Sequence, residues 1–275
     1  MKRSAFFLAL IILQTAVSFA QDAEVITKKI VYKTVGNREL SVDMFYTETS
    51  QQNSNNTAIA FFHGGGWVFG DPSEFYEACR RFARKGFVTF SFQYRLSRNA
   101  DGTYPHPGIT PVESTKDARS AIRWLRQNAG LLKINPDKIV VGGQSAGGQL
   151  ALATALLDSV NEITDNLKIS PVPNALLLYS SNVNTLEPWI DMLLGDRRNE
   201  IWSISPYHNL KKNMPPAIAF NGDQDDQVLP YITGFYKAKT TEMGNYFELH
   251  TYPGRKHYLG EGNKKYARYF DEEIL

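Results

Sequence analysis

The sequence predicts an α/β fold, with a mostly parallel, doubly wound sheet that begins in an N-terminal antiparallel hairpin. Three observations lead to this fold class. Strand and helix patterns alternate along most of the 275 residues, which indicates parallel strands joined by helices. Gly36 and Asn37 separate two early strand-like segments and are a hairpin signal. A short apolar strand at 139–141 leads directly into a Gly-x-Ser-x-Gly turn and then a helix-like stretch.

Composition and periodicity justify the individual elements. The strand segments are rich in β-branched and aromatic residues and are bounded by turn residues. The helix near 73–84 places Phe75, Cys79 and Phe82 at helical spacing, and the helix at 112–128 carries a continuous apolar stripe. In chain order we expect strands at 26–35, 40–46 and 57–62, a helix near 73–84, a strand at 87–93, a helix at 112–128, a strand at 139–141, a helix at 150–157, strands at 175–180, 217–221 and 247–252, and a C-terminal helix.

One domain is expected from residue 21 to residue 275. The chain has no repeat, low-complexity tract or interdomain linker, and its length suits a single α/β core. The segment 182–215 is rich in Trp, Leu and Pro and is too long for a plain connection, so we predict that it forms a small lid. The single cysteine, Cys79, excludes an internal disulfide and a Cys-based zinc cluster, and we expect it to be buried.

Residues 1–20 have the pattern of a secretory signal peptide. Lys2 and Arg3 precede an apolar run over 5–17, and residues 18–20 form a small-x-small cleavage site. The apolar run is short for a membrane span and is interrupted by polar residues. We therefore expect a secreted or periplasmic protein that is cleaved after Ala20 and has no stable membrane anchor.

Charge gives no sign of a nucleic-acid or anionic-membrane partner. Loss of the first 20 residues removes two basic side chains and leaves 28 Lys and Arg against 28 Asp and Glu. No basic run or stripe remains that would attract a polyanion. No oligomeric state follows from the sequence.

Ser145 is the candidate nucleophile. It lies at the centre of the Gly-x-Ser-x-Gly turn at 143–147, between the strand at 139–141 and an Ala/Leu-rich helix. This order is the context that a nucleophile elbow requires, because the serine must project from a sharp, strained turn above the sheet. The two glycines lack the Cβ atoms that would clash where strand and helix approach each other.

A second glycine-rich motif predicts an oxyanion hole. Residues 63–67 read His-Gly-Gly-Gly-Trp and close the strand at 57–62. Consecutive glycines after a strand leave backbone N–H groups free to point at a ligand oxygen. A flexible turn is the alternative, but the flanking His and Trp favour a rigid, packed loop. We expect the N–H groups of Gly65, Gly66 and Ala146 to be the donors.

These two motifs, together with Tyr-Arg-Leu at 94–96, resemble those of the α/β-hydrolase fold. Within that fold they are similar to the acetyl esterase/lipase group, which includes hormone-sensitive-lipase-like esterases and small secreted carbohydrate esterases. The likeness extends over nearly all of the chain after the first 20 residues. Hormone-sensitive-lipase relatives carry an N-terminal helical cap, whereas strands begin almost at once here. The capless carbohydrate-esterase branch is therefore the closer match.

The resemblance also selects the acid of a catalytic triad. In this fold the order is Ser, acid, His, and three acids follow the strand at 217–221: Asp223, Asp225 and Asp226. From position alone all three remain candidates. The family pattern Gly-x-x-Asp-x-x-Val implies Asp225, with Asp226 as the alternative.

Five histidines compete for the role of general base. His63 belongs to the glycine loop, His106 lies in a Pro-flanked loop, His208 is in the lid segment, and His250 lies within a strand. His257 follows the last predicted strand, on a loop at its carboxyl end, and matches the Gly-x-x-His of the family. We therefore expect His257 to be the base.

Together these residues predict a serine carboxylesterase. His257 would take the proton of Ser145 as it attacks an ester carbonyl, Asp225 would orient the imidazole, and an acyl-enzyme would form and be hydrolysed. No metal or organic cofactor is expected, because no metal-ligand cluster is visible. A lipase-like esterase, and a peptidase or amidase on the same fold, are alternatives. A non-catalytic binding protein is the least favoured, because all three triad candidates are present.

The substrate is expected to be a short-chain acyl ester, with an acetylated or feruloylated carbohydrate as the natural form. A chain without a cap domain offers little apolar wall for a long acyl tail. Trp67 and Tyr258 lie near the predicted site and could stack on a sugar or phenolic ring, as could Trp189 and Trp202. Core packing is the commoner role of Trp.

Overall fold

The computed structural model describes residues 23–259, which form one sheet with helices around it. The predicted signal peptide and the C-terminal helix fall outside the described residues. The strands are β1 (Ile26–Val35), β2 (Arg38–Tyr46), β3 (Asn56–Phe62), β4 (Val88–Phe92), β5 (Ile134–Gln144), β6 (Ala175–Tyr179), β7 (Ala217–Gly222) and β8 (Phe247–Tyr252). The helices are α1 (Glu48–Gln51), α2 (Tyr76–Arg84), α3 (Pro111–Gln127), α4 (Ala129–Leu132), α5 (Ala146–Leu156), α6 (Pro188–Leu194) and α7 (Pro230–Glu242), with 3-10 turns η1 (Pro72–Phe75), η2 (Gly195–Trp202) and η3 (Tyr207–Asn209).

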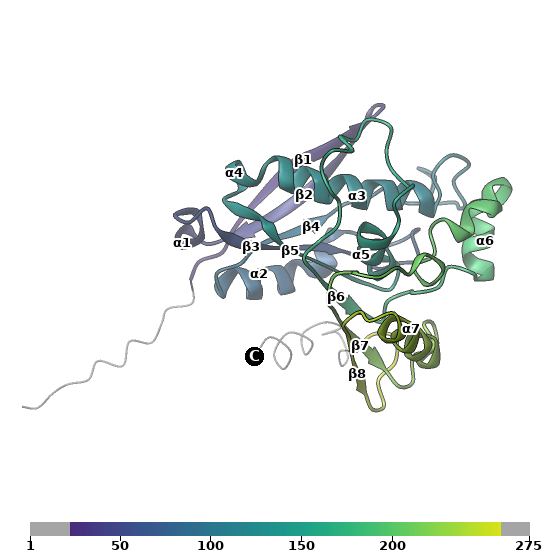
Figure 1. The fold of residues 1–275 in the computed structure, drawn as a ribbon. Helices are drawn as coiled ribbons and strands as arrows, with labels where there is room; N and C mark the ends of the chain where they lie inside the picture. The colour runs from purple at the N-terminus through teal and green to yellow at the C-terminus, as the bar shows by residue number, and fades with distance from the viewer. Residues whose placement is uncertain (1–22, 260–275) are drawn as a thin grey trace, which may run out of the picture.

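The sheet has the strand order β1-β2-β4-β3-β5-β6-β7-β8. β2 pairs antiparallel with both β1 and β4, and the remaining neighbours, from β4 to β8, pair in parallel. Figure 1 shows α3 and α5 on one side of this sheet and α2 on the other. The predicted fold class, a mostly parallel doubly wound sheet with an N-terminal antiparallel hairpin, is confirmed.

The two faces of the sheet bury two separate cores. Along β3, Ala58, Ala60 and Phe62 face the larger core, which includes the apolar residues of α3 and α5. The intervening Ile59 and Phe61 face the smaller core beneath α2. Because successive side chains of a strand point to opposite faces, a strand covered on both sides is apolar throughout. Cys79 is fully buried in the smaller core, as the sequence predicts.

Outside the predicted lid segment, which contains α6, three helices were absent from the sequence prediction. α1 and α4 have four residues each, which is too short to produce a periodic pattern. α7 is longer, but its sequence contains Gly234 and three threonines, which have low helix propensity, and Tyr231 and Phe235 are exposed. Only Pro230 at its first position signals a helix start.

The predicted lid segment, 182–215, contains α6, η2 and η3. Several of its apolar side chains are part of the larger core: Ile190, Leu193, Leu194, Ile201 and Ile204. The segment is therefore packed onto the domain in this structure. No helix within residues 23–259 is both long enough and apolar enough to cross a membrane.

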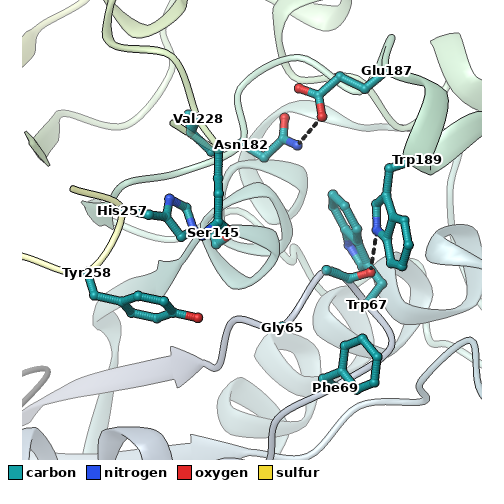
Figure 2. A pocket seen from close by; sticks show the side chains of 12 residues that line it. Gly65, Trp67, Phe69, Ser145, Asn182, Glu187, Trp189, Val228, His257 and Tyr258 are labelled. Carbon is teal, nitrogen blue, oxygen red and sulfur yellow. Dashed lines mark hydrogen bonds between the residues drawn. The ribbon is translucent and has the colours of Figure 1, made fainter. Parts of the chain in front are cut away.

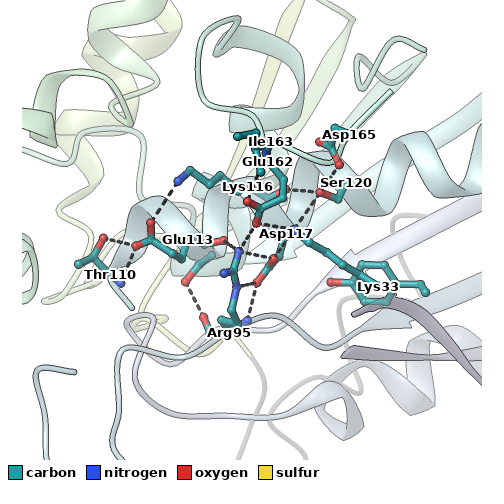
Figure 3. Close-up of polar contacts among 12 residues, drawn as sticks. Lys33, Arg95, Thr110, Glu113, Lys116, Asp117, Ser120, Glu162, Ile163 and Asp165 are labelled. Carbon is teal, nitrogen blue, oxygen red and sulfur yellow. Dashed lines mark hydrogen bonds and ion pairs between the residues drawn. The ribbon is translucent and has the colours of Figure 1, made fainter. Parts of the chain in front are cut away.

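A buried ionic cluster joins β1, the loop after β4, α3 and the loop after α5 (Figure 3). Asp117 of α3 is fully buried and pairs with Arg95 through two side-chain contacts of 2.8 Å. Lys33 lies 2.7 Å from Asp117 and 3.1 Å from Glu162, and Arg95 lies 2.8 Å from Glu162. Two cations and two carboxylates thus neutralise one another below the surface.

Candidate active site

Ser145 lies at the turn between β5 and α5, at the carboxyl edge of the sheet. Its backbone has φ 54° and ψ −117°, an uncommon conformation for a residue with a side chain. A Cβ atom on Gly147 would overlap the carbonyl oxygen of Phe62, and one on Gly143 would overlap the backbone of Gly147. The two glycines therefore allow β3, β5 and α5 to approach closely enough for this strained turn to form.

Asp225 and His257 form a buried pair. His257 Nδ1 lies 2.9 Å from Oδ2 and 3.0 Å from Oδ1 of Asp225, and the two residues are 2% and 3% exposed, respectively. Oδ1 also accepts hydrogen bonds from the N–H groups of Gln227 and Val228. Burial acts to raise the pKa of Asp225, but the hydrogen bonds from His257 and these N–H groups outweigh it and lower the pKa. The carboxylate is therefore ionised and able to orient the imidazole.

The other imidazole nitrogen, Nε2 of His257, contacts Gln144 at 3.1 Å. With the proton on Nδ1, Nε2 is an acceptor and the Gln144 amide donates to it. Within the described residues no hydrogen bond joins Ser145 Oγ to His257, although both side chains line the same pocket. Catalytic hydrogen bonds often tighten only when substrate is bound. Nε2 must exchange its amide donor for the serine hydroxyl before it can act as a base.

The glycine loop lies beside Ser145; the Gly64 N–H donates to Glu74 at 3.1 Å, whereas those of Gly65 and Gly66 are available. Gly65 and Gly66 have positive φ of 103° and 60°, and within residues 23–259 their N–H groups donate no hydrogen bond. Ala146 is the first residue of α5, so its N–H has no intrahelical acceptor. The Trp189 indole donates to the carbonyl of Gly66 at 3.1 Å and ties the loop to α6.

The rings of His63 and Tyr94 pack against each other next to the glycine loop. His63 stacks on Tyr94 with ring centroids 4.3 Å apart, and the Tyr94 hydroxyl donates to the carbonyl of His63 at 2.9 Å. Burial lowers the pKa of His63 to about 4, so the ring is neutral. His63 is 1% exposed and does not reach the pocket. These contacts pack His63 into the interior beneath the glycine loop.

Ser145, His257 and the glycine loop line a pocket of about 430 Å³ (Figure 2). The predicted binding residues Trp67 and Tyr258 both line it, but they differ in exposure. Trp67 is 1% exposed and its indole donates to Gln149, whereas Tyr258 is 36% exposed. The remaining lining residues include five that carry polar or aromatic side chains: Phe69, Asn182, Glu187, Trp189 and Gln227.

Trp202 and the other acids of the turn lie outside this pocket. Trp202 is 53% exposed and lines a separate surface depression. The Asp226 side chain is 63% exposed and lies 3.6 Å from Lys256, and Asp223 accepts the N–H of Gly254. Of the three candidate acids, the structure brings only Asp225 together with His257.

The remaining histidines have other partners. His106 accepts two backbone N–H groups, His208 contacts Ser205, and His250 contacts Glu248. Within residues 23–259 no group of three or more His, Cys, Asp or Glu side chains could hold a metal ion.

Sequence reasoning missed Gln144, Asn182 and Glu187. Gln144 occupies the variable position of the Gly-x-Ser-x-Gly turn, and its contact with His257 spans 113 residues of chain. Asn182 and Glu187 fall in the predicted lid segment, whose tryptophans were the only residues there predicted to contact substrate. The Asn182 N–H donates to the carbonyl of Ser145 at 3.1 Å. No local pattern signals such long-range contacts.

Comparison with known proteins shows that this chain is similar to esterases. Residues 42–176 match the family model described as BD-FAE. The solved structure of Thermogutta terrifontis esterase 2 phosphoramylated by tabun superposes with a TM-score of 0.77 and 31% sequence identity, and the match covers 84% of each chain. The propionate-bound structure of the same esterase has a TM-score of 0.77 and 30% identity, covering 90% of this chain and 89% of the other.

Two curated relatives match over smaller shares of their length. An arylesterase of Saccharolobus solfataricus is 35% identical over 134 residues, which are 48% of this chain and 40% of the relative. An acetylxylan esterase of Xylanibacter ruminicola is 25% identical over 229 residues, which are 80% of this chain and 44% of the relative. The chain thus spans less than half the length of both.

Proposed function

The chain belongs to the esterases of the α/β-hydrolase fold, and from that membership we propose that it hydrolyses short-chain carboxylic esters through Ser145, His257 and Asp225. One observation supports the assignment of these residues: the imidazole bound to Asp225 lines the same pocket as Ser145 and as Gly65 and Gly66, whose N–H groups donate no hydrogen bond within the described residues. The covalent tabun adduct of the solved relative supports a serine hydrolase mechanism.

The proposed reaction proceeds through an acyl-enzyme. Ser145 Oγ attacks the ester carbonyl carbon while His257 Nε2 takes its proton, and Asp225 stabilises the imidazolium that forms. The N–H groups of Gly65 and Gly66 stabilise the tetrahedral oxyanion, together with that of Ala146. The intermediate collapses, His257 protonates the departing alcohol, and water then hydrolyses the acyl-serine by the same steps. This chemistry requires no metal or organic cofactor.

We propose an acetylated or feruloylated carbohydrate as the natural substrate. The aromatic residues that line the pocket, Trp189 and Tyr258 among them, can stack on a sugar or phenolic ring. The likeness to an acetylxylan esterase supports an acylated polysaccharide or its fragments. Export with cleavage after Ala20 belongs to the same proposal, because such a polysaccharide lies outside the cell.

Activity across p-nitrophenyl esters from acetyl to palmitoyl tests this function. We expect kcat/KM to be highest from acetyl to butyryl, acetate to be released from acetylated xylan, and EDTA to have no effect. A maximum at eight carbons or longer, with interfacial activation and no release from xylan, would indicate a lipase. Faster cleavage of peptide anilides than of esters would indicate a peptidase.

A further inference from the structure

Glu187 is the one acidic side chain among the described residues that line the pocket. Figure 2 shows it on the opposite side of the pocket from His257 and Tyr258, next to Trp189. It directly precedes α6 and takes no part in the proposed proton transfers. The proposed ester hydrolysis therefore does not explain why a carboxylate lies in a pocket with aromatic walls.

The hydrogen-bonding capacity of this carboxylate is largely unused. Its side chain accepts one hydrogen bond among the described residues, from the Asn182 amide at 3.5 Å, which is at the outer limit for such a bond. No Lys or Arg lines the pocket within that part of the chain. A partly buried carboxylate without a cation or close donors loses hydration without compensation, and burial raises the pKa of Glu187 accordingly.

The loop that carries Glu187 is hydrogen-bonded to the backbone of Ser145, and the Glu187 N–H donates to the carbonyl of Thr185 at 2.9 Å. The Asn182 N–H donates to the carbonyl of Ser145 at 3.1 Å, and the Asn182 side chain contacts Glu187. Trp189 is also fixed, because its indole N–H donates to Gly66. An acceptor and an aromatic ring are thus held at defined places around the reacting serine.

We propose that Glu187 and Trp189 form a subsite for a hydroxyl-bearing ring of the substrate. Glu187 accepts a hydrogen bond from a hydroxyl group of that ring, and Trp189 packs against the ring. A hydroxyl is the group that meets the need of a carboxylate for a donor while its ring remains compatible with an aromatic wall. The hydroxyl can belong to a sugar in the alcohol part or to a phenol in the acyl part. This inference rests on the proposed ester hydrolysis at Ser145.

Two pairs of substrates identify the source of the hydroxyl. One pair is an acetylated methyl xyloside and tetrahydropyranyl acetate, which lacks sugar hydroxyls. The other is methyl ferulate and its phenol-methylated analogue. We expect the wild-type protein to prefer the hydroxyl-bearing member of one pair, and Glu187→Leu to reduce that kcat/KM ratio about 10-fold or more, because a hydrogen bond to a charged acceptor contributes more than a neutral one.

Glu187→Gln and Asp191→Asn are the matched variants. Gln keeps an acceptor oxygen without the charge, so the ratio should fall only about two- to threefold, as expected for a weaker neutral hydrogen bond. Asp191 lies on α6 and pairs with the exposed Arg198, so its neutralisation should leave the ratio unchanged. If Glu187→Leu alters neither ratio, the subsite is refuted. A choline ester serves as a cationic probe. If Glu187→Gln weakens binding of this ester and changes neither substrate ratio, the carboxylate binds an ammonium group and the proposal is wrong.

A binding measurement separates this proposal from the proposed function. Calorimetry on the Ser145→Ala protein reports the affinity for methyl ferulate and for methyl xyloside without turnover. We expect Glu187→Leu in that background to weaken binding of a hydroxyl-bearing ligand about 10-fold and to leave its methylated or deoxygenated counterpart unaffected. An equal loss of affinity for the hydroxyl-bearing ligand and for its counterpart refutes the subsite. Wild-type protein that binds these ligands but cleaves no ester refutes only the esterase function.

Discussion

The ionic cluster around Asp117 and the pocket around Ser145 both hold buried polar side chains, but they use them differently. Asp117 accepts four hydrogen bonds, from Lys33 and from three nitrogen atoms of Arg95, and so has no capacity left for another partner. In the pocket, Ser145 and Glu187 retain unused capacity. A polar group whose hydrogen-bonding capacity is filled inside the protein cannot bind a ligand directly, whereas one with free donors or acceptors can.

The largest expected effect is in the pocket, where a substitution should change activity but not stability. Ser145→Ala should lower kcat by about 10⁴-fold or more, because it removes the proposed nucleophile. It should leave the melting temperature within a few degrees, because it removes only a hydroxyl that lines the pocket and leaves the backbone unchanged. Kinetics with p-nitrophenyl acetate and thermal unfolding measure both quantities. Comparable esterase activity in the variant would remove Ser145 from its assigned role.

The second effect distinguishes two adjacent carboxylates. Asp225→Asn should reduce kcat about 10³–10⁴-fold, because an amide facing Nδ1 favours the wrong tautomer of His257. Asp226→Asn should cost less than about 10-fold, because the Asp226 side chain is 63% exposed and forms an ion pair with the exposed Lys256. The two kcat values, measured under the same conditions, decide between the acids. The reverse order would assign the acid role to Asp226.

The sequence predicted those parts of the site that depend on local backbone geometry. Ser145 and the glycine loop are each encoded in five contiguous residues, because a strained turn and a row of free N–H groups require particular residues at fixed spacing. The sheet was predicted for the same reason, since apolar strands such as β3 and β5 show their burial locally. Boundaries differed by a few residues, as at β5, which begins five residues earlier than predicted.

The remaining features depend on contacts that no short segment contains. Asp223, Asp225 and Asp226 lie within four residues of one another, and only the fold determines which carboxylate faces His257. The choice of Asp225 came from a family resemblance, and burial of that side chain against His257 is its physical basis. Gln144 and Glu187 became visible only when the fold brought distant segments together.

The third prediction concerns the ionic cluster, where a substitution should lower stability and leave kcat nearly unchanged. Asp117→Asn leaves Lys33 and Arg95 in a buried site without their shared carboxylate charge, so it should lower the free energy of unfolding by about 3–5 kcal/mol. Urea denaturation measures this loss. The kcat of the remaining folded protein should stay within a few-fold of wild type, because Asp117 does not line the pocket. Asp191→Asn, which breaks an exposed pair, should cost less than about 1 kcal/mol. Similar losses for both variants would show that the ionic cluster does not stabilise the fold.

The smallest effect compares two glutamates whose pKa values shift in opposite directions. Burial acts to raise the pKa of Glu162, but Lys33 and Arg95 outweigh it, so its pKa is lowered. Glu162 therefore stabilises the folded state above its ordinary pKa, and this contribution is lost as the pH falls through the folded-state pKa. Burial raises the pKa of Glu187. The folded state then holds that proton more tightly, so stability falls as the pH rises through the unfolded-state pKa and then the folded-state pKa.

Neutralising each glutamate should therefore change the melting temperature with opposite sign at pH 7. Glu162→Gln should lower it and Glu187→Gln should raise it, each by about 1–4 °C for a chain of this size. Both differences should shrink near pH 4, where the carboxylates of the wild-type protein take up protons. Scanning calorimetry at the two pH values measures the four differences. If Glu187→Gln lowers the melting temperature at pH 7, its carboxylate is already satisfied inside the protein. The contrast between a paired cluster and a pocket with unused acceptors would then fail at the residue on which the proposed subsite depends.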